Sequence, residues 1–184
     1  MIDRLKSIVG KKVQRLFFVV WPPFGEEDKA ELDISAGYVF EEDPNTLYVI
    51  STDKDDLTTP CINYQSLPKS FFNWADFEIR MDKWMNCTEG MEMDTEYYEV
   101  TGEGQFSNIA QNKVVDIELV GVSNEDAPIG IKLIFENDYI LSTPITDGNT
   151  IESAKFNRNN NLDNFLSLGN IKYSSIKDII LSDL

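Results

Sequence analysis

The longest uninterrupted apolar run in this chain, residues 16–21, has only six residues and stops at two prolines. A helix needs roughly 20 apolar residues to cross a bilayer, so no segment predicts a membrane span. Short runs of β-branched and aromatic residues that end at proline, glycine or acidic residues are typical of strands. Such runs recur along most of the chain. They predict an α+β protein that is mainly β, with antiparallel meanders and short terminal helices.

The first hundred residues contain clear strand signals. Residues 13–21, VQRLFFVVW, predict a buried strand, and residues 37–40 and 46–51 predict a hairpin joined across 41–45. Another strand is predicted over 96–101. Ahead of the first strand, Ile2, Leu5 and Ile8 are spaced as on one face of a short helix, and Gly10 stands where a C-terminal cap would.

Residues 71–85 fit two different periods. Trp74, Phe77, Met81 and Trp84 fall on one helical face, whereas Phe77, Ile79 and Met81 alternate with charged residues as they would in a strand. We favour a strand over 76–84, because the charged residues interleave with the apolar set.

The last third predicts a meander of three strands, over 113–122, 130–135 and 139–143. Residues 147–149, DGN, predict a turn, and residues 157–161, NRNNN, predict a polar loop. Ser174 and Ser175 could cap a terminal helix that carries Ile176, Ile179 and Ile180.

The two ends of the chain share this order of features. In each half a Lys-Val pair begins an apolar strand, a glycine precedes the next strand, and an acidic turn follows; the matching residues are Lys12-Val13 with Lys113-Val114, Gly37 with Gly130, and Phe40 with Phe135. We therefore expect a single domain over 1–184, built from two similar halves of about 1–100 and 101–184. Both a true duplication and a chance similarity between two meanders explain the pattern.

The composition restricts the chemistry. The 184 residues include 32 acidic and 16 basic side chains, a net charge of −16, and no histidine. Mechanisms that need an imidazole are excluded, among them Ser-His-Asp catalysis and His-ligated zinc. The acidic excess repels phosphate backbones and anionic membranes, so no nucleic-acid or membrane partner is expected, and a basic protein partner is favoured. The amino-terminal residues lack the pattern of a secretory signal. Cys61 and Cys87 are interpreted as reduced thiols. Together these two observations predict a cytoplasmic protein.

No motif predicts a catalytic residue, a metal site or a cofactor site. The acidic run that contains Asp53, Asp55 and Asp56 lacks the glycine and the distal glutamate of a calcium loop, and Gly102-Glu103-Gly104 lacks the third glycine of a dinucleotide site. Two carboxylates could still serve a glycoside hydrolase, with tryptophans lining a sugar cleft. A structural protein that self-associates through an acidic edge is a further alternative.

A recognition surface on the acidic turns is the hypothesis that we prefer. Carboxylates at the turns would steer a basic partner, and aromatic residues beside them, such as Trp21, Tyr38 and Tyr48, would anchor it. The candidate partner-binding residues are Phe24, Glu26, Glu27, Asp28, Glu41, Glu42, Asp43, Asp53, Asp55 and Asp56.

The strand patterns GIKLIFEND and AGYVFEED, the latter followed by TLYVIS, together with the acidic and histidine-free composition, resemble bacterial immunity proteins of polymorphic or contact-dependent toxin systems. The resemblance covers residues 10–60 and 112–150. It implies a non-enzymatic inhibitor that binds one cognate toxin, often a basic nuclease, and occludes its active site.

Overall fold

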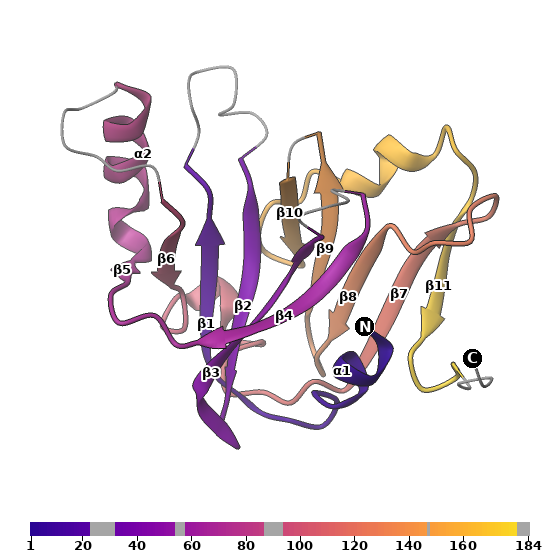
Figure 1. The fold of residues 1–184 in the computed structure, drawn as a ribbon, viewed down its shortest axis with the longest axis horizontal. Coiled ribbons are helices and arrows are strands. Elements are labelled where there is room, and N and C mark those ends of the chain that lie inside the picture. The colour runs from indigo at the N-terminus through magenta and orange to yellow at the C-terminus, as the bar shows by residue number, and fades with distance from the viewer. Residues whose placement is uncertain (23–31, 54–57, 87–93, 147, 180–184) are drawn as a thin grey trace.

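The computed structural model describes residues 1–22, 32–53, 58–86, 94–146 and 148–179, and its fold is mainly β, as the sequence predicts. Two sheets of predominantly antiparallel strands pack against each other (Figure 1). Phe24, Glu26, Glu27, Asp28, Asp55, Asp56 and Cys87 lie outside the described residues.

The first sheet has six strands in the order β4-β3-β2-β1-β6-β5. It follows a short helix, α1 (Ile2–Lys6), and contains β1 (Val13–Val20), β2 (Ile34–Phe40), β3 (Asp43–Thr52), β4 (Pro60–Ser66), β5 (Phe72–Asn73) and β6 (Glu96–Glu99). A 3-10 turn, η2 (Trp74–Asp76), leads into helix α2 (Phe77–Met85), which lies beside β6 (Figure 1). The first helix, the buried strand and the hairpin predicted from the sequence are all present.

The second sheet has five strands in the order β10-β9-β8-β7-β11. Its strands are β7 (Asp116–Val122), β8 (Gly130–Ile134), β9 (Tyr139–Ile145), β10 (Gly148–Ser153) and β11 (Ile171–Ser175), with the short turns η3 (Gly104–Phe106) before β7 and η4 (Asn161–Phe165) before β11. The predicted meander corresponds to β7, β8 and β9.

The main core lies between the two sheets. Phe18 of β1 is fully buried at its centre, and its ring centroid lies 5.1 Å from those of Trp74, Phe106 and Phe156, which come from three distant segments. Alternate residues of each strand enter this core, as the period of two requires. A smaller apolar cluster lies on the outer face of each sheet, around Phe17 in the first and Val120 in the second.

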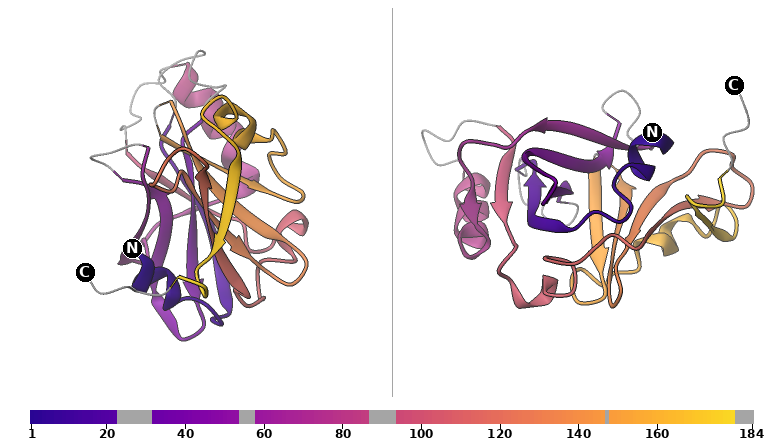
Figure 2. Two further views of the ribbon diagram at one scale, coloured as in Figure 1. Left: turned by 90° about the vertical axis from the view of Figure 1, so that its right-hand side faces the viewer. Right: turned by 90° about the horizontal axis from the view of Figure 1, so that it is seen from below.

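The two halves have the same topology. In each half four consecutive strands form a meander, and a fifth strand returns to pair with the first: β6 pairs with β1, and β11 pairs with β7. Figure 2 shows the two meanders from two further directions. The strand registers match Phe40 with Phe135 but place Lys132, and not Gly130, at the position of Gly37. The predicted match between the two glycines is therefore displaced by two residues.

A reciprocal set of backbone hydrogen bonds joins the halves at the bridge between Lys12 and Lys113. Each bond has a counterpart in which both residues change halves by a shift of 101: Gly10 N to Val114 O (2.8 Å) with Gln111 N to Val13 O (2.8 Å), and Val13 N to Asn112 O (3.0 Å) with Val114 N to Lys11 O (3.0 Å). Gly10 and Gln111 both have a positive φ, 83° and 64°. Such reciprocity is the signature of a local pseudo-twofold axis.

Two sequence predictions are wrong. Residues 77–85 form a helix, not a strand over 76–84, because Met81 and Trp84 bury the helical face against β6 while Ile79 is 59% exposed. At the carboxyl end, Ser174 and Ser175 were predicted to cap a helix carrying Ile176, Ile179 and Ile180, but they are the last two residues of strand β11 (Ile171–Ser175) and Ile176 follows in a turn; Ile180 lies outside the described residues. Backbone pairing with β7 is available there and satisfies donors that a short isolated helix would leave open. The sequence pattern also gave no signal for β10.

Candidate functional site

The described members of the predicted acidic surface lie at opposite ends of the first sheet. Glu41, Glu42 and Asp43 are at the β2–β3 turn, next to the start of β1, because Val13 pairs with Phe40. Asp53 follows the last residue of β3, which lies at the end where β1 finishes and β2 begins. Since neighbouring antiparallel strands reverse direction at each turn, these residues do not form one patch.

Carboxylates of the β2–β3 turn are partly engaged within the fold. Glu41 forms an ion pair with Lys12 (2.5 Å), and Asp43 accepts a hydrogen bond from the Tyr48 hydroxyl (2.9 Å). Burial and the adjacent Asp43 raise the pKa of Tyr48 to about 12. Glu42 is exposed. This turn therefore supports the hairpin as much as it presents charge.

Of the aromatic residues proposed as anchors that the structure describes, only Trp21 is exposed. Tyr38 is fully buried and Tyr48 is 8% exposed, so both belong to the core. Trp21 is 39% exposed, and its backbone amide donates to the Asp33 carbonyl at the point where the chain leaves β1. Burial strongly raises the pKa of the Tyr38 hydroxyl, which has no hydrogen-bond partner in the described structure.

The segments that attach to the two ends of the first sheet differ in their content of charged residues. We call the end where β1 finishes the acidic end: Val20 pairs there with Ile34 and with Glu96, and Thr52 pairs with Pro60. The connections that attach to it, 21–33, 53–59 and 86–95, contain eleven acidic and two basic residues. The segments attached at the opposite end, 1–12, 41–42, 67–71 and 100–115, contain four acidic and six basic residues. The antiparallel pairing of the strands attaches these three acidic connections to the same end of the sheet.

A cavity of about 820 Å³ lies at the acidic end, between the first sheet and the second. Its described lining has apolar side chains and neutral amides and hydroxyls, including Ile34, Pro144, Phe165 and Asn161. No charged side chain is part of this described lining. The Asn161 Nδ2 atom is buried without a hydrogen-bond partner among the described residues. An uncharged group with a hydrogen-bond acceptor matches this lining.

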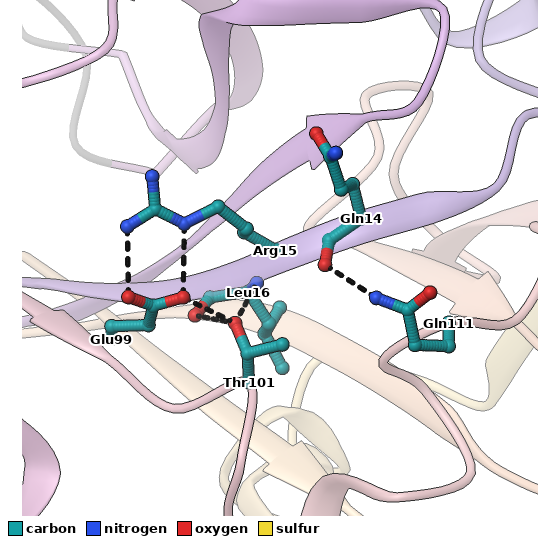
Figure 3. A network of polar contacts seen from close by, with 6 residues as sticks. All are labelled: Gln14, Arg15, Leu16, Glu99, Thr101 and Gln111. Atoms are coloured by element: carbon teal, nitrogen blue, oxygen red, sulfur yellow. Dashed lines mark hydrogen bonds and ion pairs between the residues drawn. The ribbon is translucent and has the colours of Figure 1, made fainter.

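Two ion pairs between an arginine and a glutamate of β6 were not predicted from the sequence. Arg15 donates two hydrogen bonds to the Glu99 carboxylate, at 2.9 and 2.8 Å, and its guanidinium lies against the rings of both Phe17 and Phe71, which contact each other edge to face. Figure 3 shows the pair, with Thr101 donating to Glu99. The Arg15 hydrogen bonds lower the pKa of Glu99 below its ordinary value.

The second pair joins α2 to the sheet. Glu96 is 7% exposed and accepts hydrogen bonds from Arg80, Trp84 and Tyr98, while Arg80 lies over the ring of Phe72. Burial raises the pKa of Glu96, but the three hydrogen-bond donors outweigh it and hold the pKa below its ordinary value. Both glutamates are thus ionised structural partners of arginines, and Trp84 is committed to the core and not to a sugar cleft.

Within the described residues, no three His, Cys, Asp or Glu side chains are grouped so that they could hold a metal ion, and no helix is long and apolar enough to cross a membrane. Comparisons of the chain with family models, with curated proteins and with solved structures found no match.

Proposed function

We propose that this chain is a non-enzymatic protein that binds a basic protein partner through its acidic end. In its sharpest form, the partner is a toxic enzyme such as a nuclease, and the chain occludes the site at which that enzyme binds phosphates. The observation that carries the proposal is the contrast between the ends of the first sheet: eleven acidic against two basic residues in the connections at one end, four against six at the other.

Such an asymmetry orients an approaching partner. A concentrated negative potential raises the association rate of a basic protein and turns it toward that end. Affinity then depends on a few anchoring contacts. Trp21 supplies an exposed aromatic ring at the acidic end, and the neutral cavity beside Ile34 offers a receptor for an uncharged partner side chain. The acidic residues thus steer the partner during association, and Trp21 and the cavity provide the contacts that hold it once bound.

The test compares charge reversal at the two ends. Asp53→Lys with Asp94→Lys changes the acidic end, and Glu41→Lys with Glu42→Lys makes the same change in net charge at the opposite end. The partner used is a basic protein that is captured at low salt from the source organism and whose toxicity is suppressed when this chain is co-expressed with it. We expect the first double variant to slow association about tenfold or more at low salt and to flatten its salt dependence, and the second to change little.

An equal effect of the two double variants would show that net charge alone matters, and would contradict docking at the acidic end. Failure to suppress the toxicity of any captured basic protein would contradict the inhibitor function. Trp21→Ala separates anchoring from steering: it should raise the dissociation rate and leave the association rate nearly unchanged.

A further inference from the structure

The outer face of the second sheet holds a cation between two aromatic rings. Lys132 of β8 places its Nζ atom 5.0 Å from the ring centroid of Tyr139 on β9 and 5.0 Å from that of Tyr173 on β11. The same ammonium is 3.5 Å from the Glu118 carboxylate on β7. Rings and a carboxylate that surround an ammonium group form a cation-binding cage. In this chain the cage is occupied by one of its own side chains.

The strand registers place a second carboxylate in the same row. Glu118 pairs with Lys132, Lys132 with Leu141, and Leu141 with Glu152, so that Lys132 stands between two glutamates across the outer face. The distance between adjacent strands is about 4.8 Å, which puts the Glu152 backbone about two strand spacings from that of Lys132. Burial raises the pKa of the Tyr173 hydroxyl above its ordinary value, and the negative charges of Glu118 and Glu152 raise it further.

Glu152 is buried and incompletely paired. It is 5% exposed, and one of its oxygens accepts a hydrogen bond from the Asn161 backbone amide (2.9 Å). Within the described part of the chain it belongs to no ion pair. A buried carboxylate is costly unless charged or multiple donors surround it. Glu152 can therefore accept a further cationic donor.

A pocket of about 340 Å³ adjoins these groups. Its lining includes Lys132, Tyr139, Glu152, Asp163 and Tyr173, together with apolar side chains of the outer cluster. Three carboxylates, Glu118, Glu152 and Asp163, lie in or beside the pocket, against the ammonium of Lys132 and the guanidinium of Arg158, whose charge acts on the Tyr139 hydroxyl, so these described groups together retain a net negative charge. A guanidinium group suits it better than a second ammonium, because it is planar, stacks on tyrosine and donates two hydrogen bonds to one carboxylate.

We propose that this pocket receives an arginine side chain of the basic protein partner, which displaces the Lys132 ammonium from between Tyr139 and Tyr173 and pairs with Glu152. The partner's existence rests on the function proposed above, but the pocket can be tested without it. Lys132 acts as an internal competitor that occupies the cage until arginine replaces it.

The test uses the full chain and a short, otherwise neutral peptide with one arginine, with the citrulline peptide as the uncharged control of the same shape. Binding is measured by titration while the Tyr139 and Tyr173 resonances are followed. Only the arginine peptide should shift them. Lys132→Met should tighten arginine binding about threefold or more, because it removes the competing cation. Glu152→Gln should weaken it about tenfold.

Tyr173→Leu changes a half-exposed side chain, should also weaken binding, and keeps the test decisive if Glu152→Gln fails to fold. Tyr64→Leu is its control, since Tyr64 is a similarly exposed tyrosine of the first sheet whose ring contacts Arg4. Equal binding of the citrulline peptide, or weaker or unchanged arginine binding by Lys132→Met, would overturn the pocket and leave docking at the acidic end untouched. If the arginine peptide binds more tightly than the citrulline peptide, but charge reversal at the two ends of the first sheet slows partner association equally, docking at the acidic end is contradicted and the arginine pocket stands.

Discussion

The outer faces of the two sheets occupy matching positions in two halves of the same topology, yet the first, which we call the sealed face, is closed around Phe17 by apolar packing, whereas the second carries a pocket lined by charged side chains. Across the first sheet the paired residues are Phe17, Gly37, Val49 and Asn63; across the second, at the corresponding positions, they are Glu118, Lys132, Leu141 and Glu152. Three neutral side chains and a glycine in one half correspond to three charged side chains and a leucine in the other. Identical strand order therefore does not imply identical use of a surface.

The sealed face is closed by contacts that its counterpart lacks. Phe17 is fully buried beneath Arg15 and Phe71, and Gly37 leaves room for Leu47, which also has no exposed surface. In the second sheet the position of Gly37 is taken by Lys132, whose charged end needs carboxylates and tyrosines around it. We infer that the first outer face stabilises the fold and that the second is free to bind.

The largest expected effect comes from the matched pair Phe17 and Glu118. Phe17→Ala removes a fully buried ring and should lower the free energy of unfolding by about 3 to 5 kcal/mol. Glu118→Ala removes one member of a partly exposed ion pair and should change the free energy of unfolding by less than about 1 kcal/mol. Urea denaturation followed by circular dichroism measures both. Similar losses for the two variants would mean that the second outer face is also structural.

The next effect concerns Glu96, whose counterpart on β11 is the exposed Lys172. Glu96→Gln should lower the free energy of unfolding by about 2 to 4 kcal/mol at neutral pH, because Arg80 keeps its position but loses its ionised partner. Lys172→Gln, the matched control, should have almost no effect. A loss below about 1 kcal/mol for Glu96→Gln would show that the pair is solvated in solution.

The Glu96 variant should also change the pH dependence. The pKa of Glu96 is lower in the folded state than in the unfolded chain, so its contribution to stability is present above the ordinary glutamate pKa of about 4.3 and is lost as the pH falls through the lower folded value. The wild-type chain should therefore lose stability more steeply below about pH 4.3 than Glu96→Gln does. Parallel curves from pH 7 to pH 3 would contradict this.

The smallest effect is expected from Gly37 and Lys132. A Cβ atom at Gly37 would lie 3.0 Å from Leu47 Cδ1 and 3.3 Å from Val19 Cγ2, so Gly37→Ala should cost about 1 kcal/mol through overpacking. Lys132→Ala should alter stability by less than about 0.5 kcal/mol, since its surroundings are partly open to solvent. Thermal unfolding distinguishes the two variants. A higher melting temperature for Gly37→Ala than for the wild-type chain would mean that the sealed face can accommodate an additional methyl group at this position.

Local alternation was enough to predict β1, the hairpin of β2 and β3, and the meander of β7 to β9, because in these segments one face is apolar and the other is not. It failed over 77–85, where a helical and an alternating pattern coexist and Glu96, a distant residue, stabilises the helix through Arg80 and Trp84. It failed again over 171–175, since the pairing with β7 that makes β11 a strand depends on a segment some fifty residues earlier.

The candidate sites divide in the same way. Composition and turn positions are properties of the chain, and they established the acidic character, the absence of imidazole chemistry and the mainly β class. The separation of Asp53 from Glu41, Glu42 and Asp43 depends on which end of a sheet each turn occupies. The meeting of Lys132, Tyr139, Tyr173 and Glu152 depends on the registers of four strand pairs. Register arises from the simultaneous packing of many distant side chains, so a linear pattern of residues does not contain it.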